Sequence, residues 1–131
     1  MIQLDIPDIT VKPYVRMTRR SKHVNKQALE YLASKGILSA RIREQMTLQG
    51  MDMLPAKTPL KVIIRLYAPT SPGHGADLDN QIKAILDACN KEAFPDDRWV
   101  DQIEAYRFIG EKCHLHLCIK ELVLGVNIFS D

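Results

Sequence analysis

Alternating runs of strand-forming and helix-forming residues most strongly constrain the fold of this chain. Residues 60–67 are rich in aliphatic and β-branched side chains, which indicates a buried strand. Residues 68–76 contain two prolines and two glycines, so they cannot form regular structure. From Leu78 to Cys89, apolar residues recur at the period of an amphipathic helix, and Pro95 ends whatever remains of it. A strand, a loop and a helix are therefore expected in immediate succession.

The sequence pattern of the N-terminal third predicts one more strand and a helical region. Apolar residues alternate with polar ones over residues 2–6, which predicts a strand that ends at Pro7. Asn25 is the expected cap of a helix, and Gly36 is expected to break it before a second helical segment at 39–49.

The C-terminal part predicts two strands, at residues 100–109 and 113–124, joined by a turn at Gly110. The order β-α-β-α-β-β predicts an α+β fold of two layers, with a mixed sheet and helices mainly on one face. We expect residues 1–131 to form a single domain, because this length suits one core and no linker interrupts it.

Composition excludes several classes of protein. With 46% hydrophobic and 26% charged residues, the chain is neither disordered nor a low-complexity polymer. It has no apolar run long enough to cross a membrane and no basic leader before an apolar segment, so we expect a cytoplasmic protein without a membrane partner. Three cysteines are too few for a disulfide framework, which agrees with a reducing compartment.

The formal net charge of +2 conceals two oppositely charged segments. No acid lies between Asp8 and Glu30, and a dense basic tract of this kind is typical of proteins that bind phosphate backbones. The alternative is a solvated arm without a partner. The candidate DNA-binding residues of this tract are Lys12, Arg16, Arg19, Arg20, Lys22 and Lys26.

The second segment, residues 77–104, holds eight acids against three basic residues. Inside a helix, Asp77 and Asp79 would point about 200° apart, so they converge only if Asp77 lies in the extended segment or at the cap. Lys83 lies one helical turn beyond Asp79, on the polar flank of the helix. A second acidic pair, at 96–97, follows the helix and can fold back toward the same point.

Carboxylates gathered in this way require protons or a cation. Two charges about 5 Å apart repel by about 3 kcal/mol at an effective dielectric constant near 20. Mg²⁺ prefers a few carboxylate oxygens, and it can activate water and stabilise a phosphodiester transition state. The alternative is structural: Asp77 as an ordinary helix cap and Asp79 with Lys83 as an ordinary helix ion pair.

The stretch DLDNQIKAILDACNKEAFPDD, residues 77–97, resembles the RusA family of Holliday junction resolvases, crossover junction endodeoxyribonucleases often carried by phages and prophages. The family shows a DLDN-x-x-K-A-x-x-DAL stretch followed by a DD pair. The segment KPYVRMTRRSK, residues 12–22, is similar to the basic element of many phage members. The resemblance covers most of residues 1 to about 110.

The resemblance implies a small α/β domain that works as a homodimer, uses Mg²⁺ (or Mn²⁺) and nicks a four-way junction or other branched DNA symmetrically in two strands. By position, Asp77, Asp79 and Asp97 match the family's catalytic metal-binding acids, and Lys83 matches its essential lysine. Asp96 matches the first acid of the pair, with a weaker expectation of direct ligation.

The chain departs from the family pattern at several positions. The loop before the motif is TSPGHGA, where some members have an arginine run. Arg98 and Trp99 follow the acidic pair, where a small polar residue and glutamine are common. Lysines usual on the next strand have Arg107 or Lys112 as possible replacements, and the sequence does not choose between them.

Other groups favour simpler interpretations. His114, His116 and Cys118 share one strand face, but three residues on one straight strand do not surround a zinc ion, so we expect a partly exposed sheet face. His74 is more consistent with a solvated loop residue and Trp99 with core packing.

Two other functions compete with the resolvase. One is a catalytically silent module that binds branched DNA, and the other is a different metal-dependent nuclease or phosphotransferase. No GxGxxG, P-loop or nucleophile elbow is present, so no nucleotide cofactor is expected.

Overall fold

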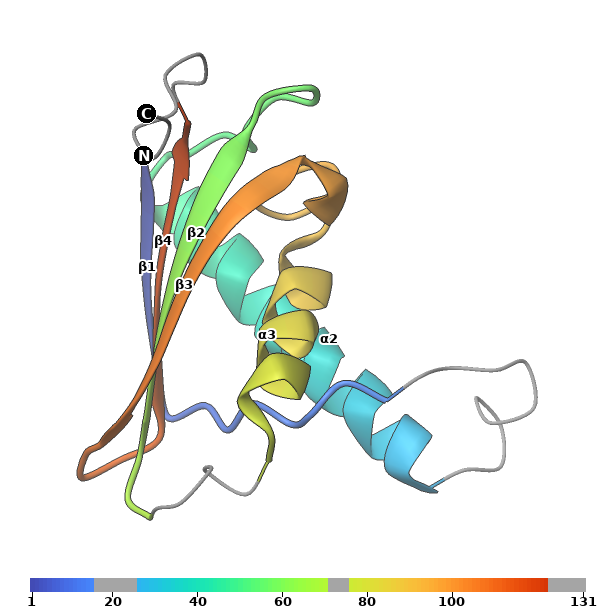
Figure 1. The fold of residues 1–131 in the computed structure, drawn as a ribbon, viewed down its shortest axis with the longest axis vertical. Helices are drawn as coiled ribbons and strands as arrows, with labels where there is room; N and C mark the ends of the chain where they lie inside the picture. Colours follow the sequence, from blue (N-terminus) through green and yellow to red (C-terminus); the bar gives the residue numbers. More distant parts are fainter. Residues whose placement is uncertain (16–25, 71–75, 123–131) are drawn as a thin grey trace, which may run out of the picture.

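The computed structural model describes residues 1–15, 26–70 and 76–122. Within these ranges, four strands form one sheet, and helices α2 (Lys26–Leu48) and α3 (Leu78–Cys89) pack on the same face of it (Figure 1). The expected α+β fold, with a mixed sheet and helices on one face, is confirmed, as is the order of elements.

The strands are β1 (Ile2–Pro7), β2 (Leu60–Ala68), β3 (Val100–Ile109) and β4 (His114–Glu121), and their order across the sheet is β1-β4-β2-β3. Strand β2 runs parallel to β3, while β4 is antiparallel to both β1 and β2. Helix α3 lies between the two parallel strands in sequence and so supplies the crossover that parallel pairing requires.

The turn at Gly110 joins β3 and β4 without making them neighbours, because β2 lies between them in the sheet. The Gly110 amide donates to the Ala68 carbonyl oxygen at 3.0 Å, which ties this connection to the end of β2. Strand β3 is consequently an edge strand beside β2.

The core lies between the sheet and the two helices. Every second residue of β2, beginning with Leu60, is buried, and the β4 residues Leu115, Leu117 and Ile119 are fully buried beside them. Helix α3 contributes the expected apolar stripe, in which Ile85 is fully buried. Each such side chain contributes roughly 1.5–3 kcal/mol by leaving water.

Helix α2 is continuous from Lys26 to Leu48, so the expected break at Gly36 is wrong. Buried residues Tyr31, Leu38 and Ile42 recur at helical spacing on both sides of the glycine. Burial of this stripe outweighs the roughly 1 kcal/mol that a glycine costs inside a helix. The expected cap, Asn25, lies outside the described residues.

Two smaller expectations are also confirmed. Trp99 is partly buried and packs against the core, and Cys89, Cys113 and Cys118 are free thiols. Among the described residues, none of the helices combines the length and the apolar character needed to cross a membrane.

Replacing Gly36 by alanine is expected to raise the free energy of unfolding by about 0.5–1 kcal/mol, measured by urea denaturation. Gly36 is exposed, and a Cβ built on it meets no atom within 4 Å. Gly50→Ala is the matched control, because Gly50 has a φ of +64° that strains alanine and should make that variant less stable. A less stable Gly36→Ala variant would contradict the continuous helix.

Candidate active site

The start of α3 places Asp77 in the N-cap position with extended backbone, at φ −71° and ψ 139°. This is the conformation that convergence of Asp77 with Asp79 requires. The Asp77 side chain makes no capping hydrogen bond, and only its backbone carbonyl engages the helix, accepting from the Gln81 amide at 3.1 Å. Asp77 therefore occupies the capping position while its carboxylate remains exposed to solvent.

Asp79 and Lys83 are also exposed. The Asp79 Oδ1 atom accepts a hydrogen bond from the Asn80 amide at 2.9 Å. Among the ion pairs of the described residues, none joins Asp79 to Lys83. The helix ion pair that offered a structural explanation for these two residues is not formed.

A pocket of about 440 Å³ lies along the polar side of α3. Helical spacing brings Lys83, Asp87 and Asn90 to its wall. Tyr14, from the segment before α2, and Asp97, from the segment after α3, also line it. Two predicted site residues, Lys83 and Asp97, thus face one cavity.

The predicted carboxylates are not all gathered at one point. Asp77 and Asp79 lie at the N-terminal end of α3 and are not among the residues that line the pocket of Asp97. In ranges 1–15, 26–70 and 76–122, no group of three or more His, Cys, Asp or Glu side chains is arranged to hold a metal ion.

The acidic pair at 96–97 has two different environments. The Arg98 amide donates to Asp96 Oδ1 at 2.9 Å and its guanidinium lies 3.4 Å from Oδ2, so these bonds lower the pKa of Asp96. The pKa of Asp97 is raised, first by burial and then by the neighbouring carboxylates of Asp96 and Asp87. A hard cation would relieve this repulsion, so the carboxylate oxygens here fit a divalent metal by their chemistry.

Asp87 and its partners were not identified from the sequence as site residues. Its Oδ2 atom accepts from the Tyr31 hydroxyl at 2.5 Å and lies 3.3 Å from the Lys35 ammonium, both on α2. Burial and this hydrogen bond raise the pKa of Tyr31. The spacing of Asp87 four residues after Lys83 was the available signal, since it places both on one side of α3.

Asn90 was also not identified. Its Oδ1 atom is buried and has no hydrogen-bond partner within the described part of the chain. Asn90 lines the same pocket as Asp97. A buried acceptor oxygen without a partner is unfavourable, so a cation or a hydrogen-bond donor bound in this pocket would stabilise it.

Most of the basic tract lies outside the described residues, namely Arg16, Arg19, Arg20 and Lys22, as does His74. Lys12 and Lys26, at its two ends, are exposed. The Tyr14 amide donates to the Asn80 carbonyl at 3.0 Å, which docks the beginning of the tract onto the first turn of α3.

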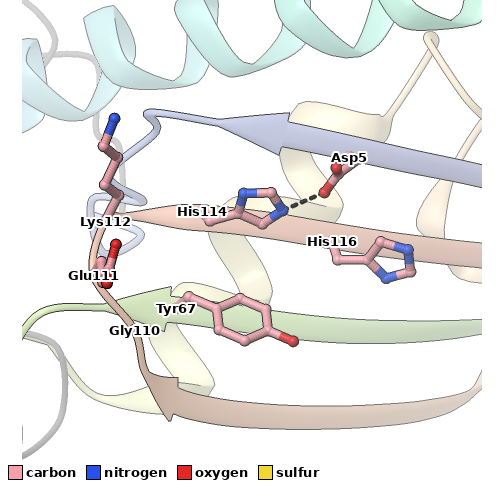
Figure 2. A pocket seen from close by; sticks show the side chains of 7 residues that line it. All are labelled: Asp5, Tyr67, Gly110, Glu111, Lys112, His114 and His116. Atoms are coloured by element: carbon pink, nitrogen blue, oxygen red, sulfur yellow. Dashed lines mark hydrogen bonds and ion pairs between the residues drawn. The ribbon is translucent and has the colours of Figure 1, made fainter.

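Another pocket, of about 490 Å³, lies on the face of the sheet away from the helices (Figure 2). His114 in this pocket is paired with the Asp5 carboxylate and lies 5.6 Å from the Tyr67 ring between centroids. His114 and His116 are partly exposed there, as expected for a sheet face, whereas Cys118 is buried. None of the predicted catalytic residues lines this pocket, so the side of α3 with Lys83 remains the candidate site.

Comparison with known proteins identifies the family of the chain. The family model for the endodeoxyribonuclease RusA matches residues 9–120, a range that contains α2, β2, α3 and β3. No curated protein matches the chain. Enzymes of this family are hydrolases that resolve crossover junctions in DNA, and they generally depend on a divalent metal. The chain belongs to the RusA family of endodeoxyribonucleases.

Proposed function

We propose that this chain is a Mg²⁺-dependent endonuclease that resolves Holliday junctions by paired, symmetric nicks. The family match supports the reaction class. The observation that carries the proposal is made at the start of α3. Asp77 is the N-cap residue, but its side chain makes no capping hydrogen bond. The side chains of Asp77 and Asp79 are both exposed. Exposed carboxylates that form no ion pair with any described residue suit metal binding.

In this proposal Asp77, Asp79 and Asp97 hold the metal and Asp96 assists. When bound, Mg²⁺ (or Mn²⁺) supplies activation of water and stabilisation of charge on the scissile phosphate. Asp97 lines a pocket that Asp77 and Asp79 do not line. For all three carboxylates to bind one ion, Asp97 and the start of α3 must therefore move closer together. Asp96 has the smaller role, because Arg98 already occupies both of its oxygens.

Lys83 supplies the positive charge of the site. Its ammonium lines the same pocket as Asp97 and has no salt bridge within the described part of the chain. A free ammonium in this position can orient the attacking water or donate to a phosphoryl oxygen as charge develops there.

The basic tract from Lys12 to Lys26 provides the grip on branched DNA, mainly through phosphate contacts that do not read sequence. Because Tyr14 docks on Asn80, one end of this tract begins beside the motif that carries the carboxylates. A homodimer completes the proposal, since paired nicks in two strands need two sites related by symmetry.

Asp79→Asn is expected to reduce nicking of a synthetic four-way junction in Mg²⁺ by about a hundredfold or more, corresponding to about 2.7 kcal/mol of transition-state stabilisation. A fork and a linear duplex serve as competing substrates. Asp101→Asn is the matched control, because Asp101 is an exposed acid on β3 outside the site.

Equal nicking by wild type and Asp79→Asn would contradict the metal assignment. Wild-type protein that binds junctions after chelation and nicks none of them with Mg²⁺ or Mn²⁺ would instead support a silent DNA-binding module.

The double variant Arg19→Ala/Arg20→Ala is expected to weaken binding to every DNA substrate and to reduce the slope of log affinity against log salt by roughly two, because two phosphate contacts are lost. Fluorescence anisotropy across a salt series measures both quantities. Lys57→Ala/Lys120→Ala removes the same charge elsewhere on the protein and is expected to leave the slope unchanged. An unchanged slope in the arginine variant would show that the tract does not contact phosphates.

A further inference from the structure

Gln81 is the polar residue that the core buries: its side chain is 2% exposed, and no other polar or charged residue of the described chain falls in the buried class. Its Nε2 atom donates to the Val11 carbonyl at 3.3 Å. Its Oε1 atom accepts from Nη1 of Arg107 at 3.4 Å. Because buried amides need partners, this position on α3 is specified by hydrogen bonding rather than by apolar packing.

Arg107 makes a second and shorter contact. The same Nη1 atom donates to the Ala76 carbonyl oxygen at 2.6 Å. Arg107 lies opposite Leu66 in the parallel pairing of β2 with β3, and Leu66 is buried beneath the helices, so Arg107 points to the helical side of the sheet. One guanidinium therefore holds positions 76 and 81 at once, and the segment between them contains Asp77 and Asp79.

The N-terminal segment meets the same turn of α3. Val11 accepts from the Gln81 side chain, and the Tyr14 amide donates to the Asn80 carbonyl at 3.0 Å. Residues 11–14, residues 76–81 and β3 are distant in sequence, and they are thus joined at Asn80 and Gln81.

We propose that Gln81 and Arg107 are positioning residues that hold Asp77 and Asp79 in place and couple them to the beginning of the basic tract. Asp77 does not cap α3 with its own side chain, so the entry to the helix depends on other bonds. The guanidinium supplies a charge-assisted bond to the residue just before Asp77, and it does so from the rigid sheet. Supporting groups of this kind orient metal-binding carboxylates and their loss weakens metal affinity. The inference rests on the proposed function only in giving Asp77 and Asp79 a metal role.

The first test measures amide hydrogen exchange by NMR on the protein without metal or DNA. Arg107→Met keeps an apolar stem and removes the donors, and the Gln81 and Tyr14 amides are expected to exchange about tenfold faster. Arg107→Lys, which keeps a charged donor, is expected to restore much of the protection. Arg65→Met is the matched control, since Arg65 lies on the opposite sheet face, 5.9 Å from the centre of the Tyr106 ring.

Unchanged exchange at Gln81 and Tyr14 in Arg107→Met would overturn the proposal. Uniformly faster exchange along α3 would also overturn it, because that result reports general destabilisation of the fold rather than release of one turn.

The second test measures Mn²⁺ affinity of the protein alone by electron paramagnetic resonance. Arg107→Met is expected to bind Mn²⁺ about tenfold more weakly, with Arg107→Lys intermediate and Arg65→Met unchanged. Faster exchange combined with unaltered Mn²⁺ affinity would overturn the positioning role. Wild-type protein that binds no Mn²⁺ would count against the metal role in the proposed function, and the exchange measurement would then decide by itself whether the two residues hold the turn.

Discussion

Burial of one face of β2 against α3 is the constraint on which the rest of the structure depends. Alternate residues of β2 from Leu60 to Ala68 are buried, and Ile85 and Cys89 of α3 are fully buried among them. Because a helix has one apolar stripe, burying it also sets the rotation of the helix about its axis. The polar stripe with Lys83 and Asp87 is thereby directed toward the pocket that Asp97 lines.

The charges of the site are organised around this helix in two groups. At its start, Asp77 and Asp79 are exposed and joined to the sheet indirectly, through Ala76, Gln81 and Arg107. Further along, burial and nearby carboxylates raise the pKa of Asp97. The net charge of the chain is near neutral because this acidic region and the basic tract largely cancel. A metal-bound enzyme would present a more positive surface to DNA than the formal charge of +2 indicates.

Local sequence patterns predicted the positions of the helices and strands well, but they predicted less well which elements are neighbours in the fold. The strands at β1, β2 and β3 and the helix at α3 followed from periodicity, and the extended conformation of Asp77 met the condition set by helical geometry. The expected break at Gly36 was wrong because propensity at one residue counts for less than a buried stripe on both sides of it. The turn at Gly110 did not reveal that β2 would lie between β3 and β4, since strand order depends on contacts beyond the turn.

The sequence by itself determined the motif that identifies the family and the spacing that places Lys83 one turn after Asp79, because both depend only on neighbours along one helix. Only the tertiary structure decided which distant residues meet that helix. Arg107 reaches Ala76 from β3, and Tyr31 reaches Asp87 from α2. Such contacts join residues tens of positions apart, so they follow from strand order and helix packing, which no local pattern encodes.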